Sequence, residues 1–163
     1  MSAGRGVAGQ HTRPSRDMTM LAPLFAGRAN VALARCEDAG LDAFVYEAHR
    51  SDALQAIYYA RGRTVIPPEQ TVTNARNSLN SWHGYGLAVD VISRSRLWSP
   101  EEVWWEWVAE IFVSEGMDWG GHWRRPDRPH FQWGGLRASP SDRARLLMRS
   151  GGFVAVWREV GAW

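Results

Sequence analysis

Two short stretches of the sequence place histidine and aspartate side chains at spacings that suit a metal site. In SWHGYGLAVD, His83 and Asp90 flank a glycine-tyrosine-glycine turn that lets the chain reverse, so their side chains can converge. In DRPHFQW, Asp127 and His130 lie three residues apart. Two histidines and one carboxylate form the protein ligand set of a catalytic zinc site, with the fourth position left for water.

Each of these residues also has an ordinary structural explanation. Asp90 interrupts an apolar, strand-like run, and a buried carboxylate without a partner is costly. A zinc ion would supply the positive charge it needs, but so would an arginine, and all nineteen basic residues of the chain are arginine. A histidine near a strand is often a hydrogen-bonded structural residue. The spacing by itself leaves both explanations open.

The elements that must position these residues follow from periodicity and capping signals. Helices are expected over 19–40, 52–61, 99–116 and 139–152, and strands over 42–49, 87–92 and 129–133. Helices and short strands do not alternate regularly, which favours an α+β fold with a small antiparallel sheet flanked by helices over a doubly wound sheet. The region 63–80 has no periodicity and is expected to be a long loop of functional importance.

Three helices have a recognisable start. Ser51 can cap the helix over 52–61, Ser99 and Glu102 form a potential capping box around Pro100, and Ser139 precedes Pro140 at the last helix. The apolar spacing predicts which side chains face the core. These are Leu21, Leu24, Phe25, Val31 and Ala32 in the first helix, and Trp104, Trp107, Val108 and Ile111 in the third.

Composition limits the class of protein. The chain has 163 residues, 45% of them hydrophobic and 22% charged, which is typical of one folded domain. We expect a flexible tail over residues 1–16 and a single domain over 17–163. A net charge of +2 without a dense basic run argues against nucleic-acid binding, and no apolar stretch reaches the length of a membrane helix. The single cysteine, Cys36, is expected to be a buried structural thiol.

Three blocks in order along the chain resemble one enzyme family. SWHGYGLAVD is similar to the S-x-H-x-x-G-x-A-x-D signature of D-alanyl-D-alanine carboxypeptidases and VanX/VanY-like zinc peptidases, which act on bacterial cell-wall peptides. GMDWGGHWRRPDRPHFQW and HRSDALQAIYYARGRT resemble segments of the L-alanyl-D-glutamate endopeptidase branch, which is common among phage endolysins. The resemblance implies a hedgehog/DD-peptidase-like zinc peptidase fold, with 17–163 as the catalytic domain.

The resemblance also implies roles for individual residues. His83, Asp90 and His130 would bind Zn²⁺, and Asp127 would be the general base. Arg50 and Ser81 match positions that contact substrate in relatives. Other side chains have weaker indications: Gln55 to support Arg50, Arg128 to assist an oxyanion, and Tyr85, Trp119 and Trp123 to line the cleft. His11 and His49 are expected to have no functional role.

One position departs from the family pattern. The W-G-G-x-W block often has aspartate at x, where this chain has His122. Since the three expected ligands and Asp127 are present without that aspartate, we expect the position to lie outside the metal shell and to tolerate change. The alternative is that His122 alters local pKa values and substrate choice.

The expected function is zinc-dependent hydrolysis of the L-alanyl-D-glutamate bond in peptidoglycan stem peptides, by a monomer. Two alternatives remain: a D-Ala-D-Ala carboxypeptidase or dipeptidase of the same family, and an inactive wall-binding module. The N-terminal residues lack the apolar core of a secretory signal. A phage or prophage endolysin made in the host cytoplasm, reaching the wall through a separate membrane pore, fits these features.

Overall fold

A four-stranded antiparallel sheet forms the centre of the computed structural model, which describes residues 10–65 and 70–163. The strand order is β1-β2-β4-β3, with β1 at Ala43–Glu47, β2 at Ala88–Ser93, β3 at Met117–Trp119 and β4 at His130–Trp133. The α-helices are α2 at Pro23–Asp38, α3 at Asp52–Ala60, α4 at Glu102–Ser114 and α5 at Asp142–Glu159. The expected α+β architecture with a small antiparallel sheet is confirmed.

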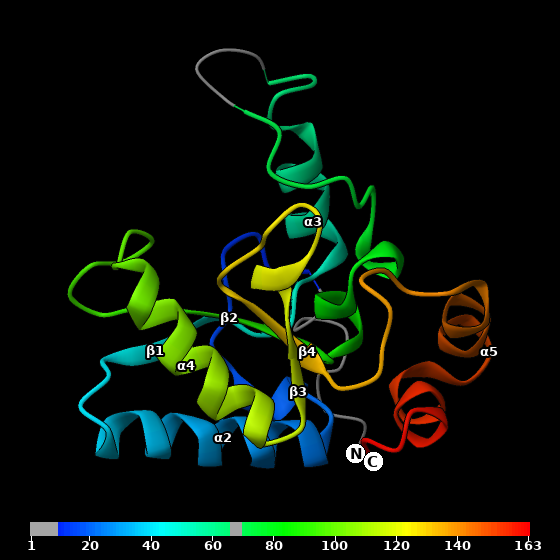
Figure 1. The fold of residues 1–163 in the computed structure, drawn as a ribbon. Coiled ribbons are helices and arrows are strands. Elements are labelled where there is room, and N and C mark those ends of the chain that lie inside the picture. Colours follow the sequence, from blue (N-terminus) through cyan, green and yellow to red (C-terminus); the bar gives the residue numbers. More distant parts are fainter. Residues whose placement is uncertain (1–9, 66–69) are drawn as a thin grey trace.

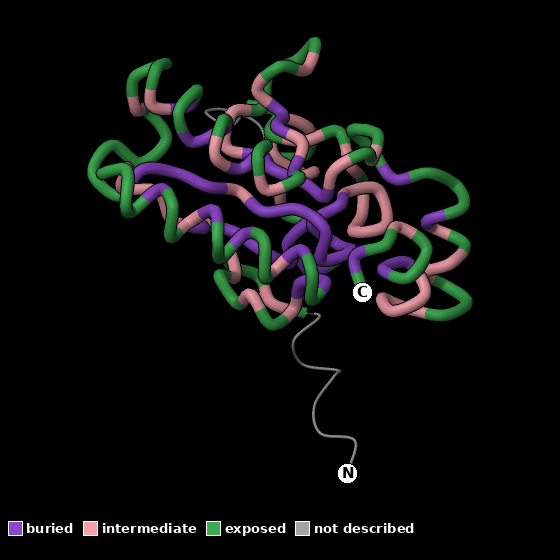
Figure 2. The backbone as a smooth tube through the Cα atoms, turned by 60° about the horizontal axis from the view of Figure 1, so that its bottom comes forward, coloured by how far each residue is buried: buried purple, intermediate pink, exposed green. Residues whose placement is uncertain are grey.

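The helices surround the sheet on different sides. In Figure 1, α2 and α4 pack together below and in front of the strands, α3 lies above them, and α5 stands at the right. Short 3-10 turns complete the connections: η1 at Met18–Met20, η2 at Ser78–Asn80, η3 at Trp82–Tyr85 and η4 at Gly120–His122. Figure 2 shows that the buried backbone runs through the strands, with the helices exposed along their outer faces. No helix in the described ranges has the length and apolar character to span a membrane.

The capping signals give a mixed outcome. Ser51 caps α3 as expected, since its hydroxyl accepts a hydrogen bond from the Leu54 N–H at 3.1 Å. The prediction of a capping box at Ser99 is wrong. The Ser99 N–H donates to the Arg96 carbonyl, which keeps Ser99 in the preceding turn, and α4 begins only at Glu102.

The start of α5 also differs from the expectation. Ser141, not Ser139, caps this helix, accepting a hydrogen bond from the Ala144 N–H at 3.1 Å. The predicted end at residue 152 coincides with a break in the helix, because Gly152 has the non-helical angles φ 69° and ψ −162°, which are accessible to glycine without strain. A second helical segment then continues to Glu159.

The predicted core faces of two helices need correction. In α4 the buried residues are Trp105, Val108, Ala109 and Phe112, while Trp107 is 53% exposed and Trp104 and Ile111 are only half-buried. The indole N–H of Trp104 donates to Asp42 at the rim of the core. The helix therefore presents the next residue, Trp105, to the core. In α2, the buried residues are Phe25, Ala29, Ala32 and Cys36, and Leu24 and Val31 are about half exposed. Cys36 is buried as expected, and burial raises the pKa of its thiol to about 11.

Only residues 10–16 of the predicted tail belong to the part of the chain that the structure describes. Residues 1–9 lie outside the described residues. Within 10–16, the Ser15 carbonyl accepts a hydrogen bond from the Ala48 N–H at 2.6 Å, and the His11 carbonyl accepts one from the Ser51 hydroxyl. This segment therefore contacts the domain beside the end of β1.

Candidate metal centre

Three of the sequence-predicted ligands meet in one place. One ligand atom from each of His83, Asp90 and His130 lies within 4.8 Å of the other two. The Nε2 atom of His83 is 3.2 Å from Asp90 Oδ1, and the Nδ1 atom of His130 is 3.7 Å from the same oxygen. Ligand atoms of a tetrahedral zinc site are about 3.3 Å apart, because each is about 2 Å from the metal. The spacing and the donor types fit Zn²⁺.

The second nitrogen of each histidine is already engaged. His83 Nδ1 lies 2.9 Å from the Ala48 carbonyl oxygen, and His130 Nε2 lies 3.0 Å from Gln132 Oε1. A carbonyl oxygen only accepts hydrogen bonds, so in both rings this nitrogen carries the proton. The other ring nitrogen faces Asp90, and when it loses its proton it becomes the lone-pair donor with which histidine binds a metal. The Gln132 oxygen is positioned by the period-two spacing that places it on the same face of β4 as His130.

The sheet register and one tight turn bring the three ligands together. Asp90 and His130 are directly paired across β2 and β4. His83 lies on η3, and the chain leaves this turn through Gly86 at φ 67°, where a Cβ would come within 2.6 Å of the Met20 carbonyl oxygen. Gly84 is equally restricted, because a Cβ there would lie 2.1 Å from the Ser78 carbonyl oxygen. The glycine-tyrosine-glycine turn is thus required to aim His83 at the strand pair.

The charge that holds Asp90 in its apolar strand comes from several neighbours. Burial alone would raise the pKa of this carboxyl, but His83, His130 and the Arg50 guanidinium together hold it well below its ordinary value. The nearest Arg50 nitrogen is 3.6 Å from Asp90 Oδ2. Of the two explanations left open by the sequence, the arginine is observed beside Asp90 Oδ2, and zinc stays a prediction for Oδ1, which faces the two histidines.

Asp127 lies beside the cluster of predicted ligands and is not part of that cluster. Its Oδ2 atom is 4.0 Å from His130 Nδ1, and its side chain is 51% exposed to the cleft. Desolvation in the cleft and the negative charge of Asp90 raise the pKa of Asp127 above its ordinary value. The backbone N–H of Asp127 donates to the Gly120 carbonyl oxygen at 2.9 Å, and this hydrogen bond closes the loop that holds Asp127. A carboxylate in this place can take up and release a proton next to the metal position.

A cleft of about 700 Å³ opens over the site. The three predicted ligands, Asp127, Ser81 and Arg50 all line it, so every predicted site residue reaches the cleft. The long loop contributes as expected, through Thr73 and its neighbours 72, 74 and 75. Substrate contact by Ser81 and Arg50 stays a prediction.

The sequence analysis missed a buried charge network behind Arg50. Glu47 is fully buried and forms an ion pair with Arg50, whose Nε donates to Glu47 Oε1 at 2.5 Å. The Tyr58 hydroxyl donates to the other Glu47 oxygen at 2.9 Å, and Gln55 accepts from Arg50 at 3.0 Å. Gln55 thus supports Arg50 as expected. The only signal for Glu47 was a charged residue at the end of an apolar strand, which also occurs at exposed strand ends.

The weaker candidates divide between the cleft and other parts of the molecule. Trp123 lines the cleft, with its ring 5.0 Å from that of His130. Tyr85 and Trp119 are core residues, and their polar atoms bind the backbone at Leu79 and Arg128. Two further residues lie on the surface outside the cleft, where they face glutamates of α4: Arg128 pairs with Glu102, and His122 is 76% exposed near Glu106.

Comparison with known proteins gives the family to which this fold and site belong. Residues 74–133 match the family described as D-alanyl-D-alanine carboxypeptidase. The peptidoglycan L-alanyl-D-glutamate endopeptidase CwlK of Bacillus subtilis is 32% identical over 124 residues, which cover 69% of this chain and 72% of CwlK. The chain belongs to this family of VanY-like peptidases.

Two solved structures share the fold. The L-Ala D-Glu endopeptidase ChiX of Serratia marcescens superposes with a TM-score of 0.53 at 25% identity, over 76% of this chain and 89% of ChiX. The LD-carboxypeptidase LdcB superposes with a TM-score of 0.51 over 85% of this chain and 68% of LdcB. At 12% identity the second likeness concerns the fold alone.

Proposed function

We propose that the chain is a zinc-dependent peptidase that hydrolyses the L-alanyl-D-glutamate bond of peptidoglycan stem peptides, as a phage or prophage endolysin. The observation that carries the proposal is the convergence of His83, Asp90 and His130 in the lining of a cleft, with Asp127 beside them. CwlK and ChiX are both named as endopeptidases for this bond, which favours it over the D-alanyl-D-alanine bond.

The residues of the site have separate roles in hydrolysis. Zn²⁺ held by the three ligands would lower the pKa of water to about 7 and polarise the scissile carbonyl. Asp127 accepts a proton from the attacking water as its oxygen bonds to the carbonyl carbon. The same carboxyl then gives that proton to the leaving amine as the carbon–nitrogen bond breaks. Its raised pKa suits both steps, because a carboxyl must be ionised for the first and protonated for the second.

The test is mass spectrometry of purified peptidoglycan digested by the zinc-loaded protein, beside a chelated sample. We expect fragments with a new N-terminal D-glutamate or D-isoglutamine that are absent after chelation. Loss of a terminal D-alanine alone would replace the proposal with a carboxypeptidase. No release from any wall type would contradict catalysis and favour a wall-binding module.

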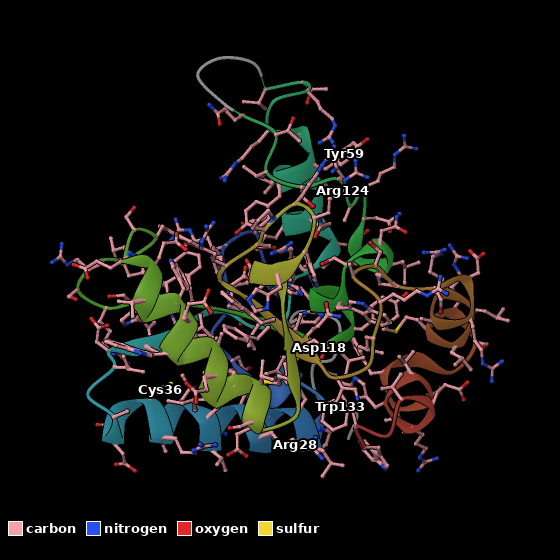
Figure 3. All side chains as sticks on the ribbon, viewed as in Figure 1. Arg28, Cys36, Tyr59, Asp118, Arg124 and Trp133 are labelled. Atoms are coloured by element: carbon pink, nitrogen blue, oxygen red, sulfur yellow. The ribbon has the colours of Figure 1, made fainter. Side chains whose placement is uncertain are left out.

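A pair of aspartate variants tests the assigned base. Asp127→Asn should reduce the rate by roughly 10²- to 10⁴-fold, while the protein still binds one equivalent of zinc, because Asp127 is not a ligand. Asp118→Asn is the matched control. Asp118 lies on β3 away from the cleft, where it accepts a hydrogen bond from the Gly135 N–H (Figure 3). An unchanged rate in Asp127→Asn would show that the base has been misassigned.

The endolysin part of the proposal rests on the resemblance of residues 116–133 to the branch found in phage endolysins. If the enzyme waits in the cytoplasm for a pore, its expression in a susceptible bacterium should leave cells intact until a membrane pore is co-expressed. Lysis without the pore would contradict this part and leave the chemistry standing.

A further inference from the structure

Two arginines line the cleft, and they differ in what they bind. Arg50 is committed to carboxylates of the protein itself, Glu47 and Asp90. Arg61, which ends α3, makes no ion pair with any carboxylate in residues 10–65 and 70–163. Its positive charge is therefore available to a ligand in the cleft.

An aromatic ring fixes Arg61 without using its hydrogen-bond donors. The guanidinium carbon of Arg61 lies 5.1 Å from the centre of the Tyr58 ring, and that of Arg50 lies 4.7 Å from the same ring. The Tyr58 hydroxyl is held in turn by Glu47. A cation–π contact positions the charge through the face of the ring, and the five N–H groups of Arg61 make no side-chain hydrogen bond to any residue in the ranges 10–65 and 70–163, so they can bind acceptors on a ligand.

A second donor comes from the loop that packs against the same corner. The Thr73 hydroxyl oxygen accepts hydrogen bonds from Gln55 Nε2 at 3.4 Å and from the Ala75 N–H at 3.1 Å. A hydroxyl has two acceptor positions and one donor, so the O–H of Thr73 is the group left to face the cleft it lines. The neighbouring backbone at Thr71 approaches Gly62 closely enough to exclude a Cβ, which holds this loop against the residue after Arg61.

We propose that Arg61, together with the Thr73 hydroxyl, forms a carboxylate-binding subsite that recognises the free α-carboxylate of D-glutamate. The inference rests on the proposed function and deepens it. In the stem peptide, D-glutamate continues the chain through its side-chain carboxyl, so its α-carboxyl is either free or amidated. The α-carboxyl is attached to the same carbon as the scissile nitrogen. On the protein side, Arg61 and Arg50 both contact the Tyr58 ring, and Arg50 also contacts Asp90, a predicted ligand.

Arg61 and the Thr73 O–H discriminate between the two forms because both of these groups offer donors only. A carboxylate accepts two charge-assisted hydrogen bonds from a guanidinium. A carboxamide at the same place has no charge, and its N–H₂ group would face other donors. The enzyme should therefore prefer walls whose D-glutamate is not amidated.

The experiment compares two synthetic peptides that differ only in this group, L-Ala–D-Glu and L-Ala–D-isoglutamine, each followed by the same third residue. We measure kcat and KM for the zinc-loaded wild type, Arg61→Gln, Arg61→Lys and Arg76→Gln. Arg76 is the matched control, because it is an exposed arginine on the same flank that does not line the cleft. Wild type and Arg76→Gln should prefer the carboxylate peptide by about tenfold in kcat/KM, mostly through KM.

The variants separate recognition from folding. Arg61→Gln should lower kcat/KM for the carboxylate peptide by about tenfold and leave the amidated peptide unchanged, so the preference disappears. Arg61→Lys keeps the charge and should keep part of the preference, which a misfolded protein would not. Equal cleavage of both peptides by wild type, or a preference that survives in Arg61→Gln, overturns the inference alone. Cleavage of neither peptide by wild type would refute the proposed function, and the inference with it.

Discussion

Replacing Glu47 with glutamine tests whether the buried charge network stabilises the metal site. Glu47 is fully buried, and the change removes the negative partner of Arg50 while keeping the size of the side chain. Removing one member of a buried ion pair costs about 3–5 kcal/mol. Arg50 keeps Asp90 as a partner at 3.6 Å, so we expect the lower end, about 3 kcal/mol or a fall in Tm of roughly 6–12 °C.

Denaturant unfolding of the chelated protein measures this loss, and a zinc titration measures its effect on the site. We expect zinc affinity in Glu47→Gln to fall about tenfold, because Arg50 then competes more strongly for Asp90. A double-mutant cycle with Tyr58→Phe should show coupling, since the Tyr58 hydroxyl loses its charged acceptor. The control Glu106→Gln, at an exposed position, should stay within about 0.5 kcal/mol. A loss below about 1 kcal/mol in Glu47→Gln would refute the reasoning.

Two further predictions concern histidines outside the ligand set. Burial and the nearby positive groups lower the pKa of His49 to about 4, so the unfolded chain takes up this proton first as the pH falls below 6.5. The chelated protein should therefore lose up to about 3 kcal/mol more stability between pH 6.5 and 4 than His49→Phe, and parallel curves would exclude this cause. His122→Ala should bind the same equivalent of zinc as wild type, because His122 points to solvent. Loss of zinc on metal analysis would place His122 in the site.

The convergence of His83, Asp90 and His130 could be anticipated from short-range features of the sequence, although the spacing left a metal site open and the resemblance supplied their roles as ligands. His83 and Asp90 are joined by one tight turn, and the alternation along a strand fixes the face on which Asp90 lies. The same alternation correctly placed His130 and Gln132 together. No long-range information was needed beyond the pairing of two strands.

The rotation of α4 and the residues behind the ligands could not be predicted in this way. α4 has tryptophans at 104, 105 and 107, so its apolar pattern fits more than one face, and the packing of the helix against β3 and α2 selects Trp105. Glu47 joins the site only because a bulge in β1 pairs it with Asp90. A bulge changes which residues are opposed, and nothing in the alternation of AFVYE indicates it.

That bulge makes the site depend on a single sheet register. Glu47, Asp90 and His130 lie side by side on β1, β2 and β4, with Asp90 in the middle. A slip of one residue in either pairing would turn the moved strand over and carry its charged side chain to the apolar face against α2 and α4. Misregistered pairings therefore bury an unpaired charge, whereas the native register joins all three to partners. The ion pairs that prepare the metal site also select the strand register that builds it.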